Sequence, residues 1–146
     1  MTRVELANEY HKKGYNCAQS VLAAFSNLTG LSEQASFDIG GGFVAGAGTG
    51  ELCGAISGAV MTLGLVTPVD TTDPVGSKKR TMALSKELQK RFSEKFGALR
   101  CQDLLKNKFA PDDTTPVAKA MGLTGHCDIM IVTAVEIVEE MLAERS

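Results

Sequence analysis

The 146-residue sequence contains no tryptophan, and aromatic residues make up only 5% of it. It also has almost no net charge, because 15 Lys and Arg residues are balanced by 17 Asp and Glu residues. Without a basic excess that could release counterions from phosphates, we expect no binding to nucleic acid. No stretch alternates apolar and polar residues over the length of a strand between hairpin turns, so few strands or none are expected.

The sequence lacks a long hydrophobic run as well. The longest one, Cys53 to Val66, is shorter than the roughly 20 residues that a membrane-spanning helix needs. The first residues, Met1 to Lys13, mix charged and apolar side chains and show no apolar core of a secretory signal. We therefore expect a cytoplasmic protein that is not inserted in a membrane.

The residues that are present indicate an ordinary globular chain. Hydrophobic residues make up 44% of the sequence and charged residues 22%, and a chain of this length can form one hydrophobic core. The 15 glycines and many alanines favour closely packed helices. We predict a single compact domain over residues 1–146.

Apolar residues recur at helical spacing through most of the chain. An i, i+3, i+4 series from Val4 to Phe25 predicts one long helix, or two joined near Gly14. Ser32 is a candidate N-cap for a short helix that ends at the glycine cluster 40–42. Residues 51–66 are apolar nearly all round, which predicts a central helix rich in Gly and Ala.

The second half of the chain predicts three more helices. Asp73 followed by Pro74 fits an N-cap and a first-turn proline, and Gly97 would end that helix. One face of it carries an apolar stripe with a spacing of four, made of Leu84, Leu88, Phe92 and Phe96. A short helix is expected around Cys101, and a last one through residues 129–141. The fold class is therefore all-α, with about five to seven helices around the central helix.

The sequence has four cysteines, and no two of them form a C-x-x-C pair. Each follows a glycine by two to four residues and precedes an apolar helical segment; they are Cys17, Cys53, Cys101 and Cys127. A helix N-terminus carries about half a positive charge, which stabilises a thiolate. If the helix starts converge, they favour either nucleophilic thiolates or a metal–thiolate cluster. The glycine-rich segment that ends at Gly50 is expected to turn tightly and pass close to the cysteines.

The same cysteines also fit a structural role. Cysteine behaves as a small buried hydrophobe, which suits a core of Ala and Gly. The alternative function is therefore a non-catalytic helical interaction module, or a homo-oligomer that packs through its Gly and Ala faces.

Residues 53–58 read Cys-Gly-Ala-Ile-Ser-Gly, the pattern C-G-A-x-x-G, with one cysteine upstream and two downstream. In this arrangement the chain resembles the C_GCAxxG_C_C family of putative redox-active proteins over nearly its whole length. It departs from the family at residues 47–49, Ala-Gly-Thr, where relatives tend to carry an Arg. The resemblance implies a small bacterial or archaeal protein that acts through four cysteines on an unidentified redox partner, with a functional link to a transporter.

Two mechanisms remain open for the four cysteines. They could be the ligands of an iron–sulfur cluster or another thiophilic metal ion, because soft thiolates select such centres. They could instead be redox-active thiols, in which one attacks a disulfide or an oxidant and a second resolves the product. Cys53 is favoured as the attacking residue by its place between a glycine-rich loop and a helix start.

Three further residues are predicted to lie near the cysteines: Gly50, Gly54 and His126. His126 directly precedes Cys127 and could act as a base, a metal ligand or a hydrogen-bond donor to a sulfur. His11 is interpreted as a partly exposed helix residue. Glu51 and Asp128 are interpreted as caps of first-turn N–H groups.

Overall fold

The computed structural model describes residues 1–106 and 114–145, and it confirms the all-α class. In this part of the chain there is no strand, and the sole ladder contact is an isolated bridge between Leu52 and Arg100. The helices are α1 (Arg3–Lys12), α2 (Cys17–Ala24), α3 (Ser26–Thr29), α4 (Glu33–Gly40), α5 (Gly54–Leu65), α6 (Pro74–Phe96), α7 (Cys101–Lys106), α8 (Pro116–Ala120) and α9 (His126–Glu144). None of these helices is long and apolar enough to cross a membrane.

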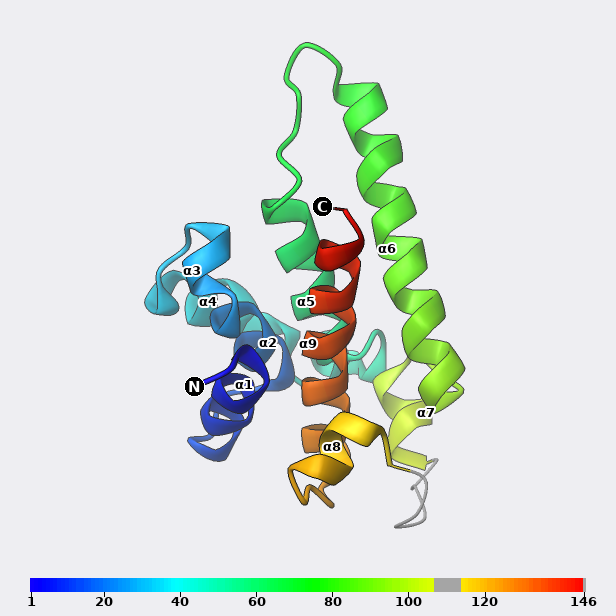
Figure 1. Cartoon of the computed structure of the whole chain (residues 1–146). Coiled ribbons are helices and arrows are strands. Elements are labelled where there is room, and N and C mark those ends of the chain that lie inside the picture. The colour runs from blue at the N-terminus through cyan, green and yellow to red at the C-terminus, as the bar shows by residue number, and fades with distance from the viewer. Residues whose placement is uncertain (107–113, 146) are drawn as a thin grey trace.

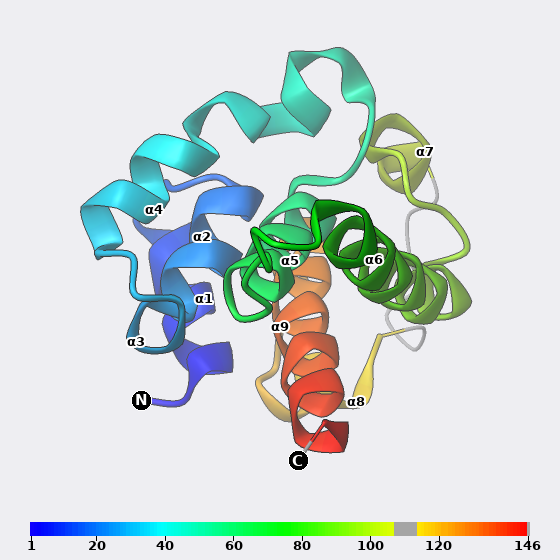
Figure 2. The ribbon, with the colours of Figure 1, turned by 90° about the horizontal axis from the view of Figure 1, so that it is seen from above.

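The helices are arranged around a central pair, α5 and α9. Figure 1 shows α6 running along one side of this pair, with α1 to α4 gathered on the other side. Viewed from above, the segment between α4 and α5 crosses the molecule and reaches the side where α7 lies (Figure 2). This crossing segment includes two short turns, η1 (Gly41–Phe43) and η2 (Gly46–Gly50).

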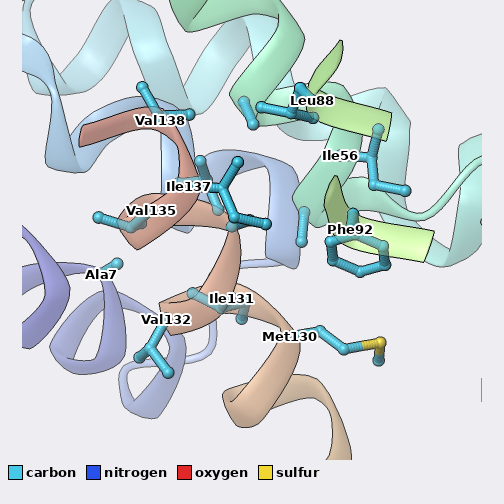
Figure 3. Close-up of a cluster of buried hydrophobic side chains, with 14 of the residues drawn as sticks. Ala7, Ile56, Leu88, Phe92, Met130, Ile131, Val132, Val135, Ile137 and Val138 are labelled. Atoms are coloured by element: carbon cyan, nitrogen blue, oxygen red, sulfur yellow. The ribbon is translucent and has the colours of Figure 1, made fainter. Parts of the chain in front are cut away.

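The core is built around α9, which is buried on most of its surface. Figure 3 shows its side chains between residues of α1, α5 and α6: Val132 and Val135 lie toward Ala7, and Met130 lies toward Phe92. Ile131, Val132, Val135, Ile137 and Val138 have no exposed surface. An apolar surface this wide fixes the position of α9, and with it the position of Cys127 at its first turn.

The N-terminal region is not one long helix, and the alternative of two helices joined near Gly14 is confirmed. Asn16 starts α2 with a capping box, in which its side chain accepts from Gln19 N and Gln19 Oε1 accepts from Asn16 N, each at 2.8 Å. A further short helix, α3, follows Phe25 and ends at Gly30 in the left-handed region. Short helices such as α3 and α8 explain why more helices are present than the five to seven expected.

The prediction for α6 is confirmed in detail. Asp73 caps it, because its Oδ1 accepts a hydrogen bond of 3.0 Å from Gly76 N, and Pro74 lies in the first turn. Gly97 ends the helix with a φ of 75°. Leu88, Phe92 and Phe96 of the predicted stripe are buried, and Leu84 is partly buried against the core.

Candidate functional site

All four cysteines lie at helix N-termini. Cys17 is the first residue of α2, Cys101 is the first residue of α7, and Cys127 is the second residue of α9. Cys53 is the N-cap of α5, which begins at Gly54 and not at Glu51 as expected. Each cysteine therefore lies at a first turn whose N–H groups have no partner within their own helix, and the N–H groups of Ala55 and Ile56 act directly on the Cys53 thiol.

The position of Cys17 is fixed by its neighbour Asn16. Besides capping α2, Asn16 donates from Nδ2 to the carbonyl oxygens of Gly40 and Gly41, at 3.1 and 3.3 Å. Gln19 Nε2 donates to Phe37 O at 2.8 Å. These bonds join the start of α2 to the end of α4, from which the crossing segment leaves.

Glycines on α5 let α2 approach closely. A Cβ added to Gly58 would lie 2.7 Å from the carbonyl oxygen of Ala18, and one added to Gly54 would lie 3.2 Å from Cys17 Cβ. Only a hydrogen fits at Gly58 without a shift of backbone. Gly54 therefore contacts Cys17 and directly follows Cys53, so it brings these two cysteines near one another.

The isolated bridge brings Cys53 and Cys101 together. Cys53 N donates to Leu99 O at 2.9 Å, and Cys101 N donates to Glu51 O at 2.6 Å. Arg100 adds an exposed ion pair, because its Nε and Nη2 lie 3.1 and 3.2 Å from the Glu51 carboxylate. Glu51 is thus a partner of Arg100, which corrects its interpretation as a helix cap.

The glycine-rich segment passes over Cys101, as expected. Ala45, Gly46, Ala47 and Gly48 all have positive φ, so the chain makes a left-handed turn here. A Cβ at Gly46 would lie 3.0 Å from Cys101 Cβ and 2.5 Å from Glu51 N, so a side chain is excluded at this position. The left-handed conformation costs about 1–2 kcal/mol at each alanine, which is the kind of strain that packing must offset.

The Cys17 and Cys127 side chains lie close enough for each thiol to be the largest influence on the acidity of the other. This interaction, helped by the nearby charge of His11, lowers the pKa of Cys127 against the opposing effects of burial and Asp128. The pKa of Cys17 is raised, because the interaction with Cys127 and burial both disfavour its thiolate. These directions favour Cys127 as the more acidic thiol of the pair.

The other two cysteines are less acidic. Burial raises the pKa of Cys53 to about 11, although the N–H groups of Ala55 and Ile56 oppose the shift. Cys53 is only 3% exposed, and an external reactant cannot approach its sulfur directly. Burial also raises the pKa of Cys101, with a further contribution from the charge of Cys127. These observations disfavour Cys53 as the attacking residue.

One contact at the site, between His11 and Asp128, was not predicted from the sequence. His11 Nδ1 lies 2.5 Å from Asp128 Oδ1, and both side chains are 29% exposed. The pair joins the last turn of α1 to the first turn of α9, beside Cys127. A separation of 117 residues hides it from any local pattern. The one available signal was that each residue lies close to a cysteine along the chain.

The remaining predicted site residues occupy different surroundings. Gly54 lies against Cys17, as described above. Gly50 lies beside α7, where an added Cβ would be 3.2 Å from Gln102 Cβ. His126 is the first residue of α9 and is partly buried. A role for Gly50 or His126 in cofactor binding stays a prediction.

A metal centre would need several ligand side chains close together. Over residues 1–106 and 114–145, no three side chains of His, Cys, Asp or Glu lie together as a ligand set. The four cysteines have the soft donor atoms that a cluster needs, but in this conformation their sulfurs do not form its coordination shell. An iron–sulfur cluster or metal ion stays a prediction.

Comparison with known proteins gives one match. No curated protein and no solved structure matches the chain. A family model described as "Putative redox-active protein (C_GCAxxG_C_C)" matches residues 15–141, a range that contains all four cysteines and the left-handed turn. The chain therefore belongs to the C_GCAxxG_C_C family.

Proposed function

We propose that this protein is a thiol–disulfide redox protein in which Cys127 attacks a disulfide and Cys17 resolves the product. The observation that carries this proposal is the placement of the two thiols at the N-termini of α2 and α9, close enough to act on each other. A thiolate is the nucleophile in disulfide exchange, and Cys127 has the lowered pKa. The described redox family supports the same class of chemistry.

The proposed reaction transfers two electrons to the substrate. The Cys127 thiolate attacks one sulfur of a disulfide, forms a mixed disulfide with it and releases the other half as a thiolate. Cys17 then loses its proton and attacks the Cys127 sulfur, which forms the Cys17–Cys127 disulfide and releases the second half. The substrate disulfide ends as two thiols, and the two protein thiols end as one disulfide.

The partial exposure of both cysteines is compatible with this role. Cys17 and Cys127 are partly accessible, whereas Cys53 is enclosed. The His11–Asp128 pair lies beside Cys127. It places a positive charge near the sulfur when the imidazole is protonated. That charge favours the thiolate and also stabilises the anionic leaving group of a disulfide.

Disulfide mapping tests the proposal. Reduced protein would be purified without oxygen, mixed with one equivalent of 4,4′-dithiodipyridine, quenched in acid at increasing times and digested for mass spectrometry. We expect a Cys17–Cys127 disulfide as the first product. Cys17→Ser should accumulate the pyridyl adduct on Cys127, and Cys127→Ser should lose the fast reaction. Far-UV circular dichroism of each variant checks that the fold is kept.

Other results would contradict the proposal. Visible absorbance with iron and acid-labile sulfide in the same sample, lost in each single Cys→Ser variant, would establish a cluster protein instead. Four thiols that react equally slowly would support the alternative of an interaction module with structural cysteines. In that case, graded losses of stability are expected on replacing each cysteine by Ala.

A further inference from the structure

The bridge between Leu52 and Arg100 creates a second cysteine pair that the proposed reaction does not use. Cys53 and Cys101 each follow one of the two bridge residues, and each donates its backbone N–H across the bridge. In an antiparallel pair, residues that flank the bridge residues project to the opposite face from them. Cys53 and Cys101 therefore share one face of the bridge.

This second pair lies next to the first. Gly54 follows Cys53 directly and contacts Cys17, with only 3.2 Å between Cys17 Cβ and the position of an added Cβ. The charges of Cys53 and Cys101 both act on Cys17, and those of Cys101 and Cys127 act on Cys53. The four thiols thus act on one another's acidity, and backbone contacts connect Cys53 to Cys17 through Gly54 and to Cys101 through the bridge.

We propose that Cys53 and Cys101 form an internal redox pair that re-reduces the Cys17–Cys127 disulfide, so that one chain delivers four electrons to two disulfide substrates. This inference rests on the proposed function. It also gives a role to Cys53, whose side chain is only 3% exposed. Such a sulfur is shielded from external disulfides and can still exchange with a neighbouring sulfur inside the protein.

The relay consists of two exchanges, and each conserves atoms and electrons. In the first, Cys53 loses its proton to solvent and attacks the Cys17 sulfur, the Cys17–Cys127 bond breaks, and Cys127 leaves as a thiolate. In the second, Cys101 loses its proton to solvent and attacks the Cys53 sulfur, and Cys17 leaves and takes up a proton. The Cys53–Cys101 pair is oxidised by two electrons, and the Cys17/Cys127 pair is reduced by two. An external dithiol would later reduce the Cys53–Cys101 disulfide.

The acidity of the thiols supports this direction. A thiol of low pKa is the better leaving group, so attack on Cys17 with release of Cys127 is the favoured first exchange. The lowered pKa of Cys127 also stabilises the reduced form of its pair, which makes that disulfide the more oxidising one. Cys53 and Cys101 have raised pKa values, and their thiolates gain no such stabilisation.

Oxidation of the second pair should open the bridge. Diagonal neighbours in an antiparallel pair have Cα atoms about 7–8 Å apart, with Cβ atoms somewhat closer, whereas a disulfide needs Cβ atoms about 3.8 Å apart. Closing the Cys53–Cys101 bond therefore moves the two segments and disturbs the hydrogen bonds of Cys53 N and Cys101 N. This movement gives a readout that is independent of mapping, namely faster hydrogen exchange at these two amides.

The test oxidises the wild-type chain by two electrons and follows over time which cysteines form the disulfide. Fully reduced protein receives one equivalent of 4,4′-dithiodipyridine, and samples are quenched in acid from milliseconds to an hour. The relay predicts that a Cys17–Cys127 disulfide forms first and is then replaced by a Cys53–Cys101 disulfide. Exchange at the Cys53 and Cys101 amides should accelerate with the second species and not with the first.

Two variants serve as a matched pair. Cys53→Ser should stop at the Cys17–Cys127 disulfide. Cys101→Ser should accumulate a Cys17–Cys53 disulfide, because Cys53 can attack but no second thiol then attacks Cys53.

A third variant tests whether the second disulfide depends on the first. Cys127→Ser should form the Cys53–Cys101 disulfide at least tenfold more slowly than the wild type. Formation at an unchanged rate would show direct oxidation and would overturn the relay.

The failure of the relay can be distinguished from the failure of the proposed function. A Cys17–Cys127 disulfide that forms rapidly and then persists in the wild type would overturn the relay alone. The absence of that disulfide from the first products would overturn the proposed function itself.

Discussion

The two cysteine pairs lie in regions of opposite construction. Cys17 and Cys127 begin α2 and α9, which are fixed by a capping box and by a wide buried surface. Cys53 and Cys101 are joined through irregular backbone, with one isolated bridge and a left-handed turn packed over Cys101. The first pair is held by regular helices, and the second is held by a few specific backbone contacts.

A helix N-terminus therefore does not by itself set the acidity of a thiol. All four cysteines share that position, yet the pKa of Cys127 is lowered while the other three are raised. The difference comes from a neighbouring thiol and a nearby imidazole in one case and from burial in the others.

The largest effect is expected at the α2–α5 contact, which supports the first pair. Gly58→Ala places a methyl group 2.7 Å from Ala18 O, so the helices must separate and the free energy of unfolding should fall by about 2 kcal/mol. The same substitution at Gly64 is the control, because no atom lies within 4 Å of the added Cβ. Gly64→Ala should raise stability by about 0.5–1 kcal/mol through helix propensity. Urea denaturation measures the change in the free energy of unfolding for both variants. Changes of the same sign would refute the close packing at Gly58.

The next effect concerns the acidity of Cys127. The rate of its alkylation by iodoacetamide should rise with pH around a midpoint well below that of an ordinary thiol, because the thiolate is the reactive form and the pKa of Cys127 is lowered. His11→Gln removes a positive charge that favours the thiolate, so the midpoint should move up. A shift of one unit lowers the reactive fraction about tenfold on the acidic side. Lys12→Gln removes a charge at the neighbouring, exposed position and should leave the midpoint unchanged. A purely structural His11 would alter stability without moving the midpoint.

The sequence predicted the elements of this fold better than their contacts. Local signals were sufficient for α6, since Asp73, Pro74 and Gly97 act within one turn of their own helix ends. Local signals also placed the cysteines at helix starts. They could not reveal the Leu52–Arg100 bridge or the His11–Asp128 contact, because both join segments far apart along the chain. The acidity of the thiols depends on such contacts, so it could not be predicted from the sequence.

A smaller effect should follow from the strain in the second region. Ala47 has a φ of 59°, so Ala47→Gly removes the Cβ penalty of the left-handed conformation and should raise stability by about 0.5–1 kcal/mol. Ala83→Gly, at an exposed position inside α6, should lower stability by about 1 kcal/mol. Opposite signs for one substitution at two sites would demonstrate the strain by thermal denaturation. A loss of stability at both would show that the turn relaxes to ordinary φ in solution.

The smallest effect is expected at the ion pair that covers the bridge. Arg100 and Glu51 are 48% and 58% exposed, so solvent screens their attraction and Arg100→Ala should cost about 0.5 kcal/mol or less. The coupling measured by a double-mutant cycle with Glu51→Ala should vanish in 1 M salt, where the screening length is about 3 Å. The bridge would then depend on the backbone hydrogen bonds of Cys53 and Cys101, and the Cys53–Cys101 pair could move without breaking a strong side-chain contact. A coupling above about 1.5 kcal/mol would show instead that the ion pair fixes the bridge, and would oppose its opening on oxidation.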